Sequence, residues 1–463
     1  MQRFLGITVL GDFILNEGVE GVLDNLEKCG ATAVACNPTV TAPSDEGEGS
    51  YQPPTDAGSS PRLFDRPLWG KRGLWVRSGA SYQPEEEFYR DTPYAPRKVN
   101  DLTKEHGHII GEFVDGAIAR GMEVYFQVDA TRPPGLREED MPRLPNGELP
   151  QNRMAESGSL ASPAIRSYIR AYVRDLLNAY PQISGLRPDW PEYPCYKLDE
   201  AFQDFGPNVR VWAEERGFNF GPMQEGVARF YDFLHGGLKN EHLADWASPE
   251  RGRFALVNGL RDAPTVPQWL RLKSALSVDL LREWRAALTA YGGEDKKLSA
   301  NAFMPPLTLF TGFDFASAAR FCDAVSPKLY TMHWSAMVEF WGRVLLERND
   351  GLDETLLVRT LAQLFDLGDA IDAEGLDDYG YPDNDQPHPV PDGCQLRKIA
   401  QVQAAAGKGM AVTPLVHGYG PLDDFMRRFR LVANSEVDGM WINRYGYLGD
   451  DKIEAIGKIN QGL

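Results

Sequence analysis

The sequence Gly185-Leu186-Arg187-Pro188-Asp189-Trp190-Pro191-Glu192-Tyr193 begins like a buried strand and ends in a loop of charged and aromatic residues. It directly follows a strong helical pattern, which opens at Ser162-Pro163 with a cap and a first-turn proline. A strand that ends in such a loop is typical of (β/α) barrels, which place their functional groups at the carboxyl ends of the strands. The stretch therefore predicts one barrel strand with a site at its end.

Strand-like and helix-like segments alternate along the whole chain. The sequence predicts eight strands, at 4–10, 31–40, 122–128, 183–187, 297–303, 324–331, 410–416 and 437–443. Helical patterns lie between them, and no glycine-rich phosphate loop follows the first strand. This order favours an α/β fold of the closed (β/α)8 type, the TIM barrel, over a doubly wound sheet.

Long insertions interrupt this pattern after strands two, three, four and six, at 41–105, 131–161, 222–290 and 370–393. We expect one catalytic domain over residues 1–463, with the insertions covering or flanking the barrel mouth. The first insertion is rich in aromatic residues, which disordered segments usually lack, so we expect it to fold over the mouth. The third is helical, and its Trp269 and Trp284 lie at helical spacing with leucines, as core residues do.

Composition limits the classes of partner. The chain has 463 residues and a formal net charge of −18 at pH 7, which argues against nucleic acids and anionic membranes. No stretch approaches the ~20 apolar residues of a membrane span. The first residues do not resemble a signal peptide, so the cytoplasm is the default location unless a leader has been removed. The five cysteines have no metal-binding spacing, Cys29 and Cys36 are expected to be buried, and the acidic surface is compatible with a monomer or a homo-oligomer.

Polar and aromatic residues follow the ends of the predicted strands, beginning with Asp12 and Asn37. Because these ends meet at one face of a barrel, we expect their side chains to line one pocket. The residues that we expect to bind substrate are Gln127, Asp129, Arg187, Trp190, Asn301, Lys328, Tyr330, His333, Trp334, His417, Tyr419, Trp441 and Arg444. The rings expected to stack on a sugar are Trp190, Trp334, Tyr419, Trp441 and Tyr445. A sugar fits this lining better than a phosphate, which would need glycines and free amides at the last two strands.

Asp189 and Glu192 are the predicted catalytic residues. Asp189 stands two residues after Arg187, and we expect that guanidinium to keep the carboxylate ionised, as a nucleophile or an oxocarbenium stabiliser requires. Glu192 lies between Trp190-Pro191 and Tyr193, where partial loss of water contacts would raise its pKa and suit a general acid. The structural alternative is an Arg187–Asp189 ion pair that fixes the loop, with Glu192 solvated or capping the next helix.

Other strand ends leave several roles open. Asp129 is a partner carboxylate, an acceptor for substrate hydroxyls, or a cap for the turn that follows it. His333 and His417 indicate a polar pocket, and His388 is expected to be a loop residue without a special role. A metal site would gather Asp129, Asp189 or Glu192, His333 and His417, but no metal-binding spacing supports one, so we predict neither metal nor cofactor.

The end of the fourth strand resembles a known superfamily. Gly185-Leu186-Arg187-Pro188-Asp189 resembles the Gly-x-Arg-x-Asp strand end of the α-amylase superfamily, where that Asp is the nucleophile. The segments 328–334 and 441–448 resemble bacterial glycosidase-like barrels. The chain departs from the α-amylase pattern twice, because Asn301-Ala302-Phe303-Met304 offers no acid and His417-Gly418 stands where His-Asp would. Glu192, or an acid carried by the insertions such as Glu156 or Glu339, must then fill the acid/base role.

These features together predict a bacterial-type glycoside hydrolase with a carbohydrate substrate. Asp189 would be its nucleophile or stabiliser and Glu192 its general acid/base. Exo-action is expected because large loops would cap the barrel mouth. Two alternatives stay open: a metal-dependent sugar isomerase or aldolase, and a barrel that binds carbohydrate without catalysis.

Overall fold

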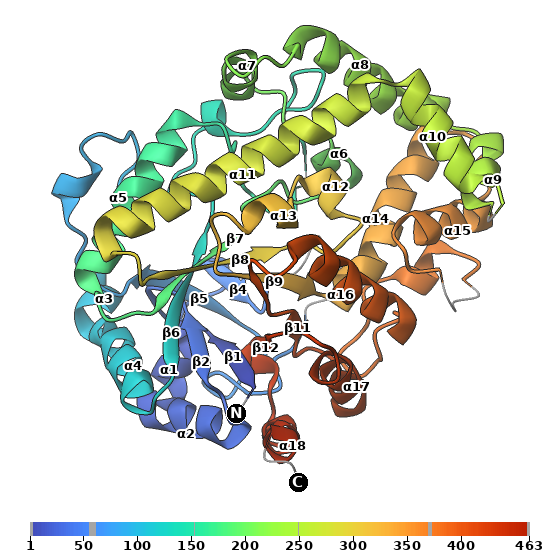
Figure 1. Ribbon diagram of the computed structural model, residues 1–463. Coiled ribbons are helices and arrows are strands. Elements are labelled where there is room, and N and C mark those ends of the chain that lie inside the picture. The colour runs from blue at the N-terminus through green and yellow to red at the C-terminus, as the bar shows by residue number, and fades with distance from the viewer. Residues whose placement is uncertain (1–2, 55–61, 152, 249, 369–372, 461–463) are drawn as a thin grey trace.

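The protein is a closed eight-stranded parallel barrel surrounded by helices (Figure 1). The computed structural model describes residues 3–54, 62–151, 153–248, 250–368 and 373–460. The barrel strands are β1 (Phe4–Val9), β2 (Ala33–Cys36), β6 (Glu123–Asp129), β7 (Gly185–Asp189), β8 (Lys297–Ala302), β9 (Ala324–Leu329), β10 (Ala411–Val412) with β11 (Leu415–His417), and β12 (Gly439–Asn443). Pairing of β8 with β9 closes the ring. The TIM barrel that the sequence predicts is confirmed, with each predicted strand in place.

Helices cover the outside of the barrel between successive strands. They include α2 (Val19–Cys29), α4 (His108–Ala119), α5 (Pro163–Ala179), α11 (Thr265–Gly292), α14 (Thr331–Arg348), α15 (Glu354–Leu364), α16 (Asp392–Ala406), α17 (Leu422–Ala433) and α18 (Asp450–Asn460). At the start of α5 the Ser162 hydroxyl accepts a hydrogen bond from Ile165 N at 3.1 Å, the cap that the sequence predicts. Trp269 and Trp284 of α11 are fully buried, as expected for core residues.

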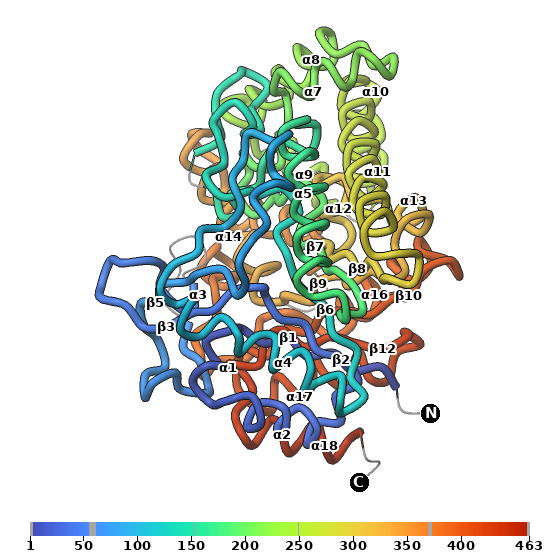
Figure 2. The backbone as a smooth tube through the Cα atoms, turned by 90° about the vertical axis from the view of Figure 1, so that its left-hand side faces the viewer, coloured from blue at the N-terminus to red at the C-terminus, as the bar shows by residue number. Residues whose placement is uncertain are grey.

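The insertions add local structure to the barrel. In the first, β3 (Thr39–Pro43), β5 (Leu74–Ala80) and β4 (Ser50–Gln52) form an antiparallel sheet, followed by the 3-10 helix Glu86–Tyr89 and α3 (Asp101–His106). In the described part of the second, the 3-10 helix Glu138–Asp140 is the one regular element. The third contains α8 (Phe220–Asp232), α9 (Asn240–Ala247), α10 (Gly252–Asp262) and α11, and Figure 2 shows α8 and α10 at the opposite side of the molecule from α2 and α18. Residues 55–61 and 370–372 of the insertions lie outside the described residues.

Short helices join the remaining elements. They are α1 (Gly11–Glu17), α6 (Leu198–Ala201), α7 (Pro207–Glu214), α12 (Thr308–Thr311), α13 (Phe315–Ala318), the π-helical turn Phe233–Gly237 and the 3-10 turns Leu376–Tyr379 and Tyr445–Tyr447. Within the described ranges, no helix is both long and apolar enough to cross a membrane. All five cysteines are buried and free, which confirms the expectation for Cys29 and Cys36.

The interior of the barrel is unusually polar for a packed core. Strand residues alternate between the two faces, and inward positions carry hydroxyls, amides and cations rather than only branched apolar chains. The buried polar side chains on the strands include those of Thr8, Arg187, Ser299, Asn301, Ser326, Lys328 and Asn443. Because buried polar groups need hydrogen-bond partners, these side chains limit which groups can point into the barrel mouth above them.

Gly6 gives a test of packing inside the barrel. A Cβ atom at Gly6 would lie 2.3 Å from Cε3 of Trp441, whose ring fills the space beside β1. Gly6→Ala is therefore expected to lower the free energy of unfolding by roughly 1–3 kcal/mol, measured by urea denaturation. The matched control is Gly21→Ala in α2, where a Cβ meets nothing within 4 Å and the expected change is a gain of about 0.5–1 kcal/mol. An equal change in the free energy of unfolding for the two variants would contradict this packing.

Candidate functional site

The accessible part of the barrel mouth follows one continuous arc of strands. Asn37, Gln127, Asp129, Asp189, Trp190 and Arg444 each leave part of the side chain accessible, and they stand at the ends of β2, β6, β7 and β12. These strands are contiguous in the order β12-β1-β2-β6-β7. On the other side of the mouth Asn301, Lys328, Tyr330 and His417 are buried. The arc, with the buried residues behind it, is the candidate site.

Asp189 forms an ion pair with Lys328 of the neighbouring wall. Its Oδ1 lies 2.6 Å from the Lys328 Nζ, and both side chains are largely removed from solvent. This corrects the predicted pairing of Asp189 with Arg187. Burial lowers the pKa of Lys328, whereas the neighbouring Asp189 raises it. The attraction between the two groups at this short distance therefore offsets part of the effect of burial on Lys328.

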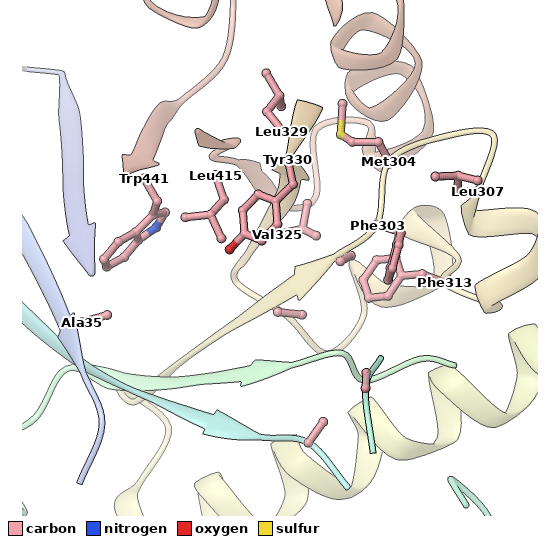
Figure 3. Close-up of a cluster of buried hydrophobic side chains, with 14 of the residues drawn as sticks. Ala35, Phe303, Met304, Leu307, Phe313, Val325, Leu329, Tyr330, Leu415 and Trp441 are labelled. Carbon is pink, nitrogen blue, oxygen red and sulfur yellow. The ribbon is translucent and has the colours of Figure 1, made fainter. Parts of the chain in front are cut away.

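Arg187 points into the barrel below the mouth. It donates to Ser299 Oγ at 3.1 Å and to Asn301 Oδ1 at 2.7 Å, and its Cζ lies 3.6 Å from the centre of the Trp441 ring. Burial lowers its pKa to about 9. Figure 3 shows Trp441 with Leu415 and Tyr330 in this interior. Arg187 thus supports the floor of the site.

Glu192 is fully buried near the Asp189–Lys328 pair. Its Oε1 accepts a hydrogen bond from Phe303 N at 2.7 Å, and its Oε2 accepts one from the Thr311 hydroxyl. Burial raises the pKa of Glu192 to about 7, against the lowering effect of these hydrogen bonds and of Lys328. The predicted rise in the pKa of Glu192 is present, and the structure excludes a solvated Glu192.

Asp129 and Asp189 stand side by side at the mouth. They are register partners on the parallel strands β6 and β7, and Ala130 N donates to Asp189 O at 3.1 Å. The Asp129 side chain is accessible to solvent, although protein groups surround its carboxyl. Burial among these groups, together with the charge of Asp189, raises its pKa. Asp129 is therefore the more exposed of these two carboxyls.

Trp190 follows Asp189 in a rarely populated backbone conformation. Its φ is +54°, in the left-handed region that bulky residues seldom adopt. Its indole Nε1 is buried and has no hydrogen-bond partner among the described residues, and the Lys328 Nζ lies 3.9 Å from the ring centre. Backbone strain of this kind concentrates at functional sites, because the surrounding structure has to maintain it.

Several polar atoms lining the mouth are buried without a partner in the described part of the chain. They are Gln127 Oε1, Arg187 Nε, Trp190 Nε1, Asn301 Nδ2, His388 Nε2 and Arg444 Nε. A buried polar group without a hydrogen bond costs about 1–3 kcal/mol, so such groups are rarely left together without a ligand or water to bind. Five of these residues lie in β6, β7 or β8 or directly after β7 or β12, and His388 lies in the loop before α16.

A histidine and tyrosine cluster forms the buried wall of the mouth. Tyr330 contacts the rings of His333 and His417 at centroid distances of 5.4 and 4.9 Å. The His417 Nδ1 accepts a hydrogen bond from Tyr419 N at 3.1 Å, and the Tyr419 hydroxyl donates to Pro382 O at 2.8 Å. Burial lowers the pKa of His417 well below its ordinary value, so the His417 ring is uncharged at neutral pH.

Three of the rings expected to stack on a sugar lie elsewhere. Trp441 is inside the barrel, in edge contact with Phe4 and Tyr125 at 5.5 and 5.6 Å. Trp334 belongs to the first turn of α14 and is buried 5.4 Å from the Lys398 Nζ. The Tyr445 hydroxyl donates to Glu17 Oε2 at 2.6 Å, between the barrel and α1. Trp190 is the only one of the five predicted rings that keeps an accessible surface.

The sequence interpretation missed two residues of the mouth. Arg62, from the first insertion, is buried with Nη1 3.5 Å from His417 Nε2. His388, assigned no role, is buried 5.7 Å from the Tyr419 ring, and its Nδ1 lies 2.6 Å from the Thr331 hydroxyl. A charged or aromatic residue inside a long insertion was the available signal, but its partner strand cannot be identified from spacing.

The other acids considered for proton donation are engaged in ion pairs. Glu156 pairs with Arg132 at 2.5 Å and Glu339 with Arg343 at 2.8 Å. Across the described ranges no three His, Cys, Asp or Glu side chains come close enough to hold one metal ion. The four-residue set that the metal alternative requires is thus not assembled.

A groove lies outside the barrel, along α11. This groove of about 560 Å³ is lined by Trp212, Phe218, Arg271, Asp279, Asp314 and three further arginines. Asp279 accepts from Arg166 at 2.6 Å and from the Trp212 indole at 2.8 Å. Asp279 of this groove is paired with arginines, whereas the barrel mouth holds the two candidate carboxyls and several polar atoms without a partner among the described residues, so we place the chemistry at the mouth.

Lys328→Met tests the pair at the centre of the site. Removing the ammonium leaves the Asp189 carboxylate without its cation in a largely buried position, so we expect unfolding to require roughly 3–5 kcal/mol less free energy. The matched control is Lys297→Met, which breaks an exposed pair with Glu123 and should cost at most about 1 kcal/mol. Urea denaturation of both variants checks this, and a Lys328→Met cost as small as the control's would contradict the buried pair.

The fold resembles those of two β-galactosidases. The enzyme from the psychrophilic Marinomonas ef1 has a TM-score of 0.52 and 10% identity, with 99% of this chain and 59% of that chain covered. The enzyme from the Antarctic haloarchaeon Halorubrum lacusprofundi has a TM-score of 0.51 and 11% identity, with 99% and 57% covered. This chain therefore spans less than two thirds of either enzyme. No protein-family model and no curated protein sequence matches it.

These neighbours are glycoside hydrolases built on a TIM barrel, as the sequence resemblance implied. At such identity the likeness establishes the fold alone. The function has to be argued from the residues at the mouth.

Proposed function

We propose that this protein is a glycoside hydrolase that works with Asp189 and Glu192 at the carboxyl end of β7. The observation that carries the proposal is the contrast between the two carboxyls. Asp189 lies against an ammonium at 2.6 Å, while burial raises the pKa of Glu192 to about 7. Glycoside hydrolysis uses two carboxyls in different surroundings, one as general acid and the other as nucleophile or stabiliser.

Each group then has a defined task. Glu192, whose pKa burial raises to about 7, donates a proton to the glycosidic oxygen as the bond to the leaving group breaks. The Asp189 carboxylate faces the positive charge that develops at the anomeric carbon, and it either stabilises that charge or attacks it. Lys328, 2.6 Å from Asp189, positions its carboxyl group. Asp129, Gln127 and Asn37 supply hydrogen bonds to sugar hydroxyls from the accessible arc.

Trp190 provides the apolar surface for the sugar in this proposal. Its ring is partly accessible, and its strained backbone directs it from the end of β7. We further propose exo-action, supported by contacts of the first insertion with the mouth. Arg62 reaches His417, and Phe64 packs in edge contact with Phe13 at 5.1 Å and against Tyr447 at 5.2 Å.

The experiment that tests the proposal is hydrolysis of a panel of 4-nitrophenyl α- and β-glycosides, with and without a chelator. Release of nitrophenolate that is unchanged by the chelator supports it. Activity lost with the chelator and restored by a divalent ion favours the metal-dependent alternative. Saturable sugar binding without any turnover favours the non-catalytic barrel.

A further inference from the structure

The groove along α11 collects arginine side chains from three parts of the chain. They are Arg271 and Arg282 of α11, Arg216 of the turn between α7 and α8, and Arg320 directly after α13. Figures 1 and 2 show α13 beside α11 on the outside of the barrel. The residues that line the groove are distinct from those of the candidate site at the mouth, so the two sites can be tested separately.

Asp279, the buried acid of the groove, is shared among several arginines. It forms ion pairs with Arg282 and, at 2.6 Å, with Arg166. The guanidinium of Arg216 lies 3.9 Å from the same carboxylate. Burial alone would raise the pKa of Asp279, but the charge of Arg166 and the hydrogen bonds to the carboxylate keep it below its ordinary value. One carboxylate therefore faces three guanidinium groups.

The other acids beside the groove do not balance the remaining charge. Asp314 accepts a hydrogen bond from Ser317 N at 3.2 Å and caps α13. Glu215 lies 3.4 Å from Arg216. With Arg166 and Glu215 included, five guanidinium groups stand against three carboxylates. The groove is thus positive on a chain whose net charge is −18.

Arg271 and Arg320 have no acidic partner in the part of the chain that the structure describes. The Arg320 Nε donates to Ser317 O at 3.3 Å, and its guanidinium lies 5.5 Å from the centre of the Phe321 ring. Both arginines are exposed, so a ligand can bind them without breaking an existing ion pair.

The arginines are spaced for an extended ligand. Arg271, Ala275, Val278 and Arg282 follow one another at helical intervals and share one face of α11. The rise from Arg271 to Arg282 is roughly 16 Å, so these two cations stand at opposite ends of that face. The groove volume of about 560 Å³ lies within the ~300–1,000 Å³ of ordinary ligand sites, and a single small anion would fill little of it.

The walls of the groove do not suit a peptide. The Trp212 ring is buried, its indole N–H donates to Asp279 at 2.8 Å, and Arg216 covers its face at 4.1 Å. The large ring is therefore no pocket for the anchoring side chains of a docked helix. The lining comes from α7, α11, α13 and the turns beside them, so it presents no strand edge to an extended peptide.

The surface between the arginines combines hydroxyls with small apolar groups. Ser274 and Ser317 supply the hydroxyls, and Ala275 and Val278 supply the apolar surface. A sugar ring has the matching pattern, with hydroxyls on its edge and C–H groups on its faces.

We propose that the groove binds an acidic oligosaccharide, a chain of sugars whose carboxylates pair with the unpartnered arginines. A guanidinium fork matches a carboxylate with two parallel hydrogen bonds, and arginines at both ends of the groove match carboxylates that recur along a chain. The groove lies outside the barrel, so this inference goes beyond the proposed hydrolysis and does not depend on it.

The test is calorimetry at physiological salt with trigalacturonate and with the neutral galactose trisaccharide. We expect the wild type to bind trigalacturonate at least about tenfold more tightly than the neutral chain. Arg271→Gln and Arg320→Gln should each raise the Kd for trigalacturonate about 3- to 10-fold, and the double variant about 10- to 100-fold. Neither residue forms an ion pair within the described ranges, so the fold should be kept.

The matched control is Arg359→Gln on α15, which removes the same charge from an exposed arginine outside the groove. Its Kd should stay within about twofold of the wild-type value. A loss in this control as large as that in Arg271→Gln would show that overall charge alone attracts the chain, and it would overturn the proposal.

Other results would also overturn it. Absence of binding, or equal binding of the acidic and neutral chains, would remove the groove as a site for acidic sugars. Tighter binding of an oligoglutamate peptide or of a sulfated trisaccharide would overturn the choice of a carboxylated sugar. Each of these results leaves the hydrolase standing, whereas binding in the groove without cleavage of any glycoside would support the groove and contradict the hydrolase.

Discussion

Asp189→Asn abolishes hydrolysis while the protein remains folded: this is the largest effect that the account predicts. The amide keeps the shape of the side chain but removes the negative charge that faces the anomeric carbon. A loss of at least about 10³-fold in kcat is expected, as for removal of a main electrostatic stabiliser. The measurement is nitrophenolate release from the best glycoside of the panel, with circular dichroism to confirm the fold.

The control for this variant is Asp245→Asn on α9, an exposed acid paired with Arg251 outside the barrel mouth. It should retain the wild-type rate within about twofold, because surface pairs contribute little to stability. An Asp189→Asn protein that is as active as this control would remove Asp189 from the mechanism.

Glu192→Gln has the second largest expected effect, and it depends on pH and on the leaving group. Burial raises the pKa of Glu192 to about 7, so the carboxyl is protonated below that pH and loses its proton above it. The wild-type rate should therefore fall as pH rises through about 7. The variant should lose this alkaline limb, together with about 10²- to 10⁴-fold in rate on substrates with poor leaving groups.

A nitrophenyl leaving group needs little protonation, so Glu192→Gln should lose much less activity on nitrophenyl glycosides than on alkyl glycosides. Asp129→Asn is the matched comparison, because Asp129 is the other carboxyl of the mouth whose pKa is raised. If the alkaline limb disappears in Asp129→Asn and persists in Glu192→Gln, then Asp129 donates the proton and the assignment of Glu192 is wrong.

The barrel could be predicted from the sequence because each strand carries its own signal. A buried strand reads as a short apolar run between turn residues, and eight such runs separated by helical patterns leave few topologies. Boundaries were less certain. The sixth strand was expected to run to residue 331, but β9 ends at Leu329 and α14 begins at Thr331, so His333 and Trp334 belong to a helix.

The depth of a side chain within the barrel could not be predicted. Arg187 and Asp189 are two residues apart and share the inward face, as strand periodicity requires. They nevertheless occupy different levels, so Arg187 bonds to Ser299 and Asn301 while Asp189 reaches Lys328. Which strand supplies the partner depends on the stagger of the closed barrel, and a single sequence does not record it.

The residues that the insertions contribute to the mouth could not be predicted from the sequence either. Arg62 comes from a segment whose aromatic content indicated folding over the mouth, yet its neighbour His417 lies 355 residues further along the chain. Contacts of this range follow from tertiary packing alone.

The measurement that tests the central claim most directly is the reaction of the best glycoside of the panel in water labelled with oxygen-18. The account predicts that the label appears in the anomeric hydroxyl of the released sugar with the wild type, and that Asp189→Asn forms no labelled product. An unsaturated sugar would show that the bond breaks by elimination, and a released sugar without the label would show that water does not attack the anomeric carbon. Either result would contradict hydrolysis by the carboxyl pair.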